Sequence, residues 1–88
     1  MKKHNITLNQ LIEEYKRRNN HYFDKETLKH WGERLSDMRI LENTVVKTDF
    51  QGNIHECIVL SKISKDFYGK KYRNYDYFDI DTLNRIID

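Results

Sequence analysis

Residues 44–50, TVVKTDF, and residues 54–64, IHECIVLSKIS, flank the triplet QGN. Both segments are rich in β-branched residues, which favour strands. The glycine of the triplet suits a turn position with a positive φ angle, so the stretch predicts a β-hairpin. The second strand is apolar on both faces, because Ile58 alternates with Cys57 and Val59. We therefore place it in the centre of a sheet.

The residues after this hairpin predict another strand. Residues 65–71, KDFYGKK, are typical of a loop around Gly69, and residues 72–78, YRNYDYF, are typical of a strand. The final residues, DTLNRIID, predict a short closing helix.

Two amphipathic helices are predicted before the hairpin. Thr7 and Gln10 have the spacing of a capping box, and an apolar stripe follows from Leu8 to Tyr15. The pair Asn19-Asn20 ends this helix. The second helix carries an apolar face formed by Leu28, Trp31, Leu35 and Met38. Gly32 inside it indicates a close contact with another element, since glycine weakens a helix interior by about 1 kcal/mol relative to alanine.

One phrase occurs twice in the chain. Tyr22-Phe23-Asp24 with Thr27-Leu28 returns as Tyr77-Phe78-Asp79 with Thr82-Leu83. In both copies the aspartate is a good N-cap, and the Phe and Leu positions suit a hydrophobic staple. We interpret each copy as the end of a strand, a cap and the start of a helix. A convergent acid–base pair of Asp24 and Asp79 is the less favoured alternative, because both residues would have to leave their caps.

The length and composition indicate one domain spanning residues 1–88, with the N-terminal helix at 6–19 and an α+β core at 21–88. We expect a small antiparallel sheet of three to four strands with two to three helices. The 16 Lys/Arg and 14 Asp/Glu give a formal charge of +2, which is too even to indicate nucleic acid by itself. The single cysteine excludes an internal disulfide and suits a reducing cytosol. No run approaches the ~20 apolar residues of a membrane span, so we expect a cytoplasmic location without a membrane partner.

The sequence offers little for catalysis or metal binding. His55 and Cys57 share one face of a strand, but a single pair falls short of the usual four zinc ligands. Cys57 stands in an apolar strand, where a thiol keeps its proton. No nucleophile elbow, phosphate loop or H-E-x-x-H motif is present. We therefore expect neither an enzyme nor a cofactor, metal or catalytic residue.

The most distinctive surface lies between Lys65 and Tyr77, where cations are interleaved with aromatic residues. Three uses fit this mixture: a guarded sheet edge, a protein-binding hot spot, and a surface that stacks single-stranded nucleic acid. Period-two alternation places Arg73, Tyr75 and Tyr77 on the outer face of the strand. The predicted partner-binding residues are Tyr68, Lys70, Lys71, Arg73, Tyr75 and Tyr77.

The two copies of the repeated phrase and the D-x-x-G-N-x-H-x-C segment from Asp49 to Cys57 also resemble a family of small proteins. This uncharacterised family occurs in bacteriophages and mobile elements of Gram-positive bacteria, and its pattern is YFD-x-x-TL, then G-N-x-H-x-C, then YFD-x-x-T. The resemblance implies a phage setting and no activity.

In that setting we expect a non-enzymatic inhibitor of a host protein, such as a CRISPR effector or another defence enzyme, in the host cytoplasm. The alternative is a small single-stranded nucleic-acid-binding protein.

Overall fold

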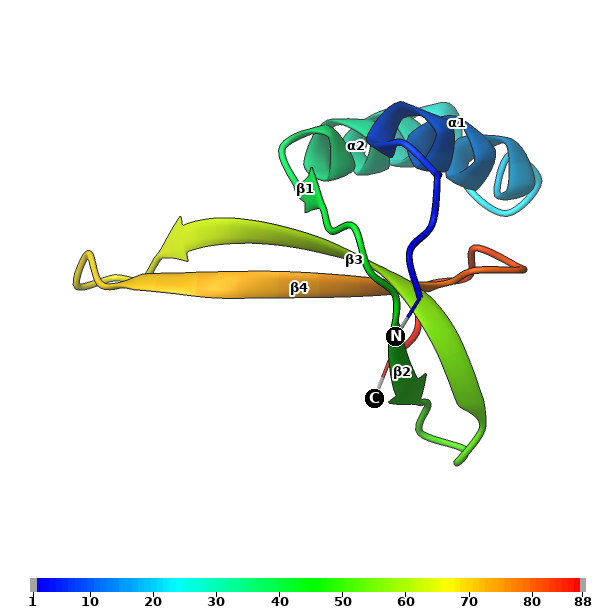
Figure 1. Cartoon of the computed structure of the whole chain (residues 1–88). Coiled ribbons are helices and arrows are strands. Elements are labelled where there is room, and N and C mark those ends of the chain that lie inside the picture. Colours follow the sequence, from blue (N-terminus) through cyan, green and yellow to red (C-terminus); the bar gives the residue numbers. More distant parts are fainter. Residues whose placement is uncertain (1, 88) are drawn as a thin grey trace.

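The computed structural model describes residues 2–87 and places two helices over one side of an antiparallel four-stranded sheet (Figure 1). The α+β fold expected from the sequence is therefore confirmed. The elements follow one another as α1 (Leu8–Arg18), α2 (Lys25–Ser36), β1 (Arg39–Ile40), β2 (Val45–Thr48), β3 (Ile54–Lys65) and β4 (Lys71–Asp79).

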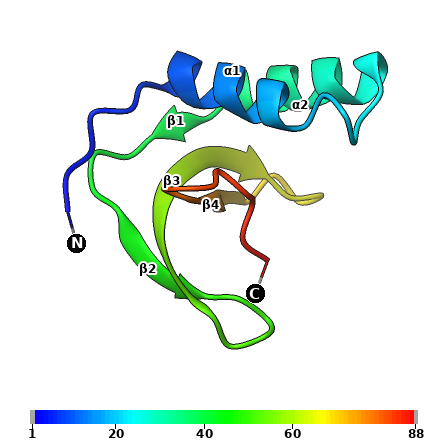
Figure 2. The same ribbon diagram turned by 90° about the vertical axis from the view of Figure 1, so that its right-hand side faces the viewer.

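β3 is the centre of the sheet, as its double-sided apolar pattern predicts. It pairs with β4 along one edge and with β2 and β1 along the other, antiparallel in each case. The predicted β2–β3 turn is confirmed, and Gly52 adopts a φ of 89° there. Figure 2 shows β3 as a curved strand, with the helices on one side and the C-terminal segment within its curve.

The helices bury their apolar stripes against one face of this sheet. Thr7 and Gln10 form the predicted capping box, and α1 ends at Asn19. Tyr15 is almost fully buried and contacts Trp31 and Phe78 edge-to-face, with ring centroids 5.8 and 5.5 Å apart. The buried core that joins helices and sheet consists of Leu11, Ile12, Tyr15, Leu35, Met38, Ile58, Leu60, Phe78 and Leu83.

A charged cluster ties α2, β4 and the C-terminal segment together beside this core. The buried carboxylate of Asp76 accepts two hydrogen bonds from Arg85, at 3.2 and 3.0 Å, and lies 3.5 Å from the Arg34 guanidinium. Both guanidinium groups lie over the ring of Trp31, at 5.2 and 5.5 Å from its centroid. The two arginines therefore offset the cost of burying the Asp76 charge.

The repeated phrase builds two different structures, so part of its interpretation was wrong. Asp24 caps α2 as predicted and accepts from the amide of Thr27. In the second copy, Asp79 accepts from the amides of Asp81 and Thr82, but no helix forms among residues 80–87. Leu83 has a φ of 58°, which lies outside helical geometry.

Strand pairing takes the place of the expected closing helix. The carbonyl of Asn84 accepts from the amide of Asp79, and the amide of Ile86 donates to the carbonyl of Tyr77. The C-terminal segment thus pairs with the end of β4 through an isolated β-bridge between Arg85 and Phe78. The expected strand at Tyr22-Phe23 is also wrong, because these residues belong to the turn between the two helices.

Candidate functional site

The candidate site is the part of the β3–β4 hairpin that projects past the end of the helices (Figure 1). We call residues 62–75 the hairpin arm. Its turn is organised by Asp66, whose carboxylate accepts from the amides of Tyr68 and Lys70, at 2.9 and 2.8 Å. Gly69 supplies a φ of 80°, as its predicted loop position requires. These bonds hold the tip in a defined shape without help from the core.

Two aromatic side chains at the tip lie almost wholly in solvent. Phe67 is 96% exposed and Tyr68 is 90% exposed. Their rings contact each other edge-to-face, with centroids 5.5 Å apart. The two rings form a small exposed apolar patch at the tip, which can serve as a contact surface for a partner.

The face of β4 that points away from the helices carries the predicted trio of Arg73, Tyr75 and Tyr77. The two tyrosine rings are stacked at 6.3 Å with an interplanar angle of 24°. Arg73 donates to the hydroxyl of Ser61 across the strand pair, at 3.4 Å. Lys47 lies over the Tyr77 ring with its ammonium 4.6 Å from the centroid.

The structure thus divides the six predicted residues into two groups. Tyr68 and Lys70 lie in the turn at the tip, whereas Lys71, Arg73, Tyr75 and Tyr77 are aligned along one face of β4. Sequence reasoning missed Lys47, which comes from another strand. The signal was available in the hairpin register, because Lys47 pairs with His55 and so lies on the same face.

The inner face of β4, opposite to Arg73 and Tyr75, is less buried along the arm than the alternation predicts. Phe78 and Asp76 are buried, as inner-face residues should be, but Tyr72 is 48% exposed and Asn74 is exposed. The reason is that the helices cover only the C-terminal half of β4. The arm therefore offers both of its faces to a partner.

Charge is concentrated in the same segment. The hairpin arm contains five Lys or Arg residues and one aspartate, which gives it a formal charge of +4 in a chain whose total is +2. Asp66 is engaged by the turn amides. The arm is therefore a cationic projection on an otherwise slightly acidic domain.

A second polar cluster lies at the other end of the sheet and gathers the D-x-x-G-N-x-H motif. His55 Nδ1 lies 2.7 Å from Asp79, and its Nε2 lies 2.8 Å from Asp49. The bond to Asp49, followed by that to Asp79, raises the pKa of His55, and the bond from His55 lowers the pKa of Asp49 to about 2.

Burial acts to raise the pKa of Asp79, but the Thr82 amide, His55 and the Asp81 amide outweigh it and lower that pKa. Both ring nitrogens of His55 are thus occupied by carboxylates. Within residues 2–87, no group of three or more His, Cys, Asp or Glu residues is arranged to hold a metal ion. The cluster joins the β2–β3 turn to the end of β4.

Cys57 is fully buried beside this cluster. Its thiol lies 3.7 Å from the His55 carbonyl, and burial raises the pKa of the thiol. A protonated, covered thiol is a poor nucleophile.

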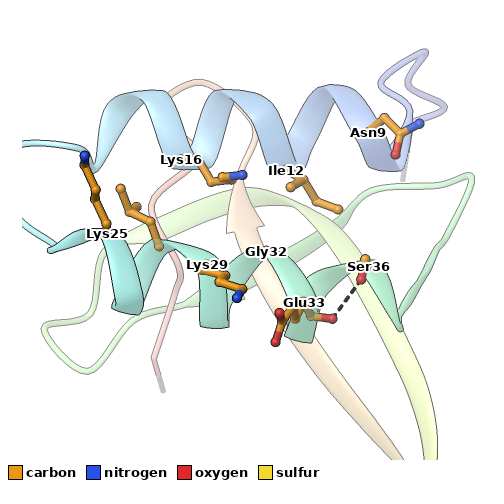
Figure 3. Close-up of a pocket in the computed structure, with 9 residues that line it drawn as sticks. Asn9, Ile12, Lys16, Lys25, Lys29, Gly32, Glu33 and Ser36 are labelled. Carbon is orange, nitrogen blue, oxygen red and sulfur yellow. Dashed lines mark hydrogen bonds between the residues drawn. The ribbon is translucent and has the colours of Figure 1, made fainter.

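An open groove of about 470 Å³ lies between α1 and α2, and Figure 3 shows the side chains around it. Ile12 and Leu28 supply apolar surface, and Lys16, Lys25 and Lys29 are its cationic residues. None of these three lysines forms an ion pair with the residues that the structure describes. The sequence did not point to this groove, because its residues come from two helices.

No protein family, curated protein or solved structure matches this chain at a significant level. Neither helix within residues 2–87 has the length and apolar character that crossing a bilayer requires.

Proposed function

We propose that this chain is a non-enzymatic binding protein that attaches to another protein through its hairpin arm. The observation that carries this proposal is the exposure of Phe67 and Tyr68 at the tip of a projecting, structured hairpin. Burial of these rings in a partner removes a large apolar area from water, and aromatic side chains have few rotors to immobilise.

The face of β4 supplies the polar half of the same interface. Arg73 can form forked hydrogen bonds with a carboxylate, and the adjacent Tyr75 is a residue type enriched in hot spots. Because the arm has a formal charge of +4, the complementary partner surface is acidic.

The setting of this binding follows from the resemblance to small phage and mobile-element proteins. We propose that the partner is a host protein in the bacterial cytoplasm, such as a CRISPR effector or another defence enzyme, and that binding inhibits it. An inhibitor of this kind blocks a surface and needs no catalytic group of its own.

A single-stranded nucleic acid is the second candidate ligand, and one observation favours it. The stacked pair of Tyr75 and Tyr77 shares one face of β4 with Arg73, and Lys47 lies over the Tyr77 ring. Bases stack on such rings while phosphates meet the cations.

Affinity capture from a Gram-positive bacterial lysate, with and without nuclease, tests the proposal. A captured protein that survives nuclease and is lost with the Arg73→Ala/Tyr75→Ala variant is the expected result, with binding weakened by about 2 kcal/mol or more. Tyr22→Ala is the matched control, because Tyr22 is an exposed tyrosine outside the arm. Capture that disappears with nuclease and falls steeply with salt would support the nucleic-acid alternative instead.

A further inference from the structure

The outer edge of β4 carries backbone groups that the sheet does not use. Antiparallel ladders alternate between residues bonded to one neighbour and residues directed to the other side. The Lys70 carbonyl accepts from the Asp66 amide within the hairpin. The Tyr77 carbonyl instead accepts from the Ile86 amide on the opposite side of the strand. Even-numbered residues of β4 therefore bond to β3, and odd-numbered residues point outward.

The C-terminal segment occupies only one end of this edge. Its described pairing with β4 is centred on Phe78 and Arg85. The outward amides and carbonyls of Lys71, Arg73 and Tyr75 have no such strand beside them among residues 2–87. An edge of this kind is a template for an additional strand.

We propose that an extended acidic segment of the partner protein pairs with the free edge of β4 from Lys71 to Tyr75 and continues the sheet. This proposal rests on the proposed protein-binding function and specifies how the partner is held. Strand addition supplies main-chain hydrogen bonds, and pockets beside the edge supply specificity.

The side chains around the edge indicate the chemistry of that segment. Lys71 and Arg73 flank the edge on one face, and Lys70 precedes them, so carboxylates on the added strand find three cations. Tyr72 and Tyr75, each 48% exposed, lie on opposite faces. They can cover apolar side chains of the same segment from both sides.

A synthetic probe tests this pairing. The probe is a peptide of alternating valine and glutamate with blocked ends, and the same peptide with lysine in place of glutamate is its control. In isotope-labelled full-length protein we expect the glutamate peptide to slow hydrogen exchange of the Arg73 and Tyr75 amides by on the order of tenfold. The amides of Tyr72 and Asn74 already bond to β3 and should change little. Unchanged exchange at Arg73 and Tyr75 with the glutamate peptide in excess would overturn the proposal, as would equal protection by the lysine peptide.

Two variants of Arg73 distinguish the contribution of the backbone edge to peptide binding from that of the side chain. Arg73→Ala removes the side chain alone, while Arg73→Pro also removes the outward amide, which an edge strand tolerates. We expect Arg73→Pro to weaken peptide binding by about tenfold more than Arg73→Ala does. Equal binding by two folded variants would overturn strand addition. If the proline variant fails to fold, the hydrogen-exchange measurement on the unmodified protein tests strand addition by itself.

The two proposals fail in different ways. Suppose that the arm captures a nuclease-resistant partner, but the peptide does not protect the Arg73 and Tyr75 amides. This result would refute strand addition and leave the proposed protein-binding function standing. If the peptide protects these amides but no partner is captured, strand addition at β4 stands and the proposal of a host-protein target is contradicted.

Discussion

His55 joins two parts of the sheet, because its ring bonds to Asp49 in the β2–β3 turn and to Asp79 at the end of β4. Its pKa is raised above 6.5 in the folded protein, so its contribution is complete below 6.5 and is lost as pH rises through the folded value. Asp49 and Asp79 have lowered pKa values, so their contribution is complete above 3.8 and is lost as pH falls. The free energy of unfolding should therefore be highest between about pH 4 and 6.5.

Chemical denaturation at a series of pH values measures this dependence. His55→Gln should lower the free energy of unfolding most within that window and flatten the decline toward alkaline pH. His21→Gln is the matched control, since His21 is exposed in the turn between the helices. A His55→Gln profile that parallels the unmodified protein from acid to alkaline pH would contradict the assigned role.

The repeated phrase shows which parts of a secondary-structure element local sequence signals determine. Both aspartate side chains accept hydrogen bonds from backbone amides of the residues that follow them, as the capping interpretation predicts. The helix forms only after Asp24, because the residues after Asp79 pair with β4 instead. The capping signal fixes the first bonds of a turn, and the available partners decide what the chain does next.

The first helix cap gives a direct prediction. Asp24→Ala removes the acceptor for the Thr27 amide and should lower the free energy of unfolding by about 1 kcal/mol. Urea denaturation measures this loss. Asp79→Ala should cost more, because it removes the acceptor of two amides and also one of the two carboxylates bonded to His55. Equal losses for the two variants would contradict a contribution from these additional bonds.

Substitution of Gly32 should raise the free energy of unfolding rather than lower it. Glycine is poor in the interior of α2, and a Cβ there would lie 3.6 Å from the Lys16 side chain, an ordinary contact with a flexible group. The contact expected from the sequence is therefore present but loose. Gly32→Ala should raise the melting temperature and stabilise the protein by roughly 0.5–1 kcal/mol. Gly52→Ala should destabilise it, since Gly52 has a φ of 89°.

The sequence predicted the strands of this protein better than it predicted their assembly. The hydrophobic pattern of β3 places it at the centre, and alternation along β4 places Arg73 and Tyr75 together. Tyr72 is exposed because the helices do not cover its part of β4. The periodicity of the sequence carries no information on where that cover ends. Nor does it bring Asp49 to His55 and Asp79, because their distance depends on the curvature of β3 and on the turns at its end.

We expect the aromatic tip of the hairpin arm to serve binding rather than folding. Phe67 and Tyr68 contact each other and solvent, so the domain gains almost nothing from their apolar surface. Phe67→Ser with Tyr68→Ser should change the free energy of unfolding by less than about 0.5 kcal/mol, as is usual for exposed positions. Phe78→Ala, the matched change in the core, should cost about 3–5 kcal/mol.

Urea denaturation of the two variants beside the unmodified protein makes this comparison. If the tip variant is stable but captures no partner, the two aromatic residues serve binding rather than folding. A loss of more than about 1 kcal/mol at the tip would show instead that these rings support the domain itself, and the arm would no longer be the preferred interaction surface.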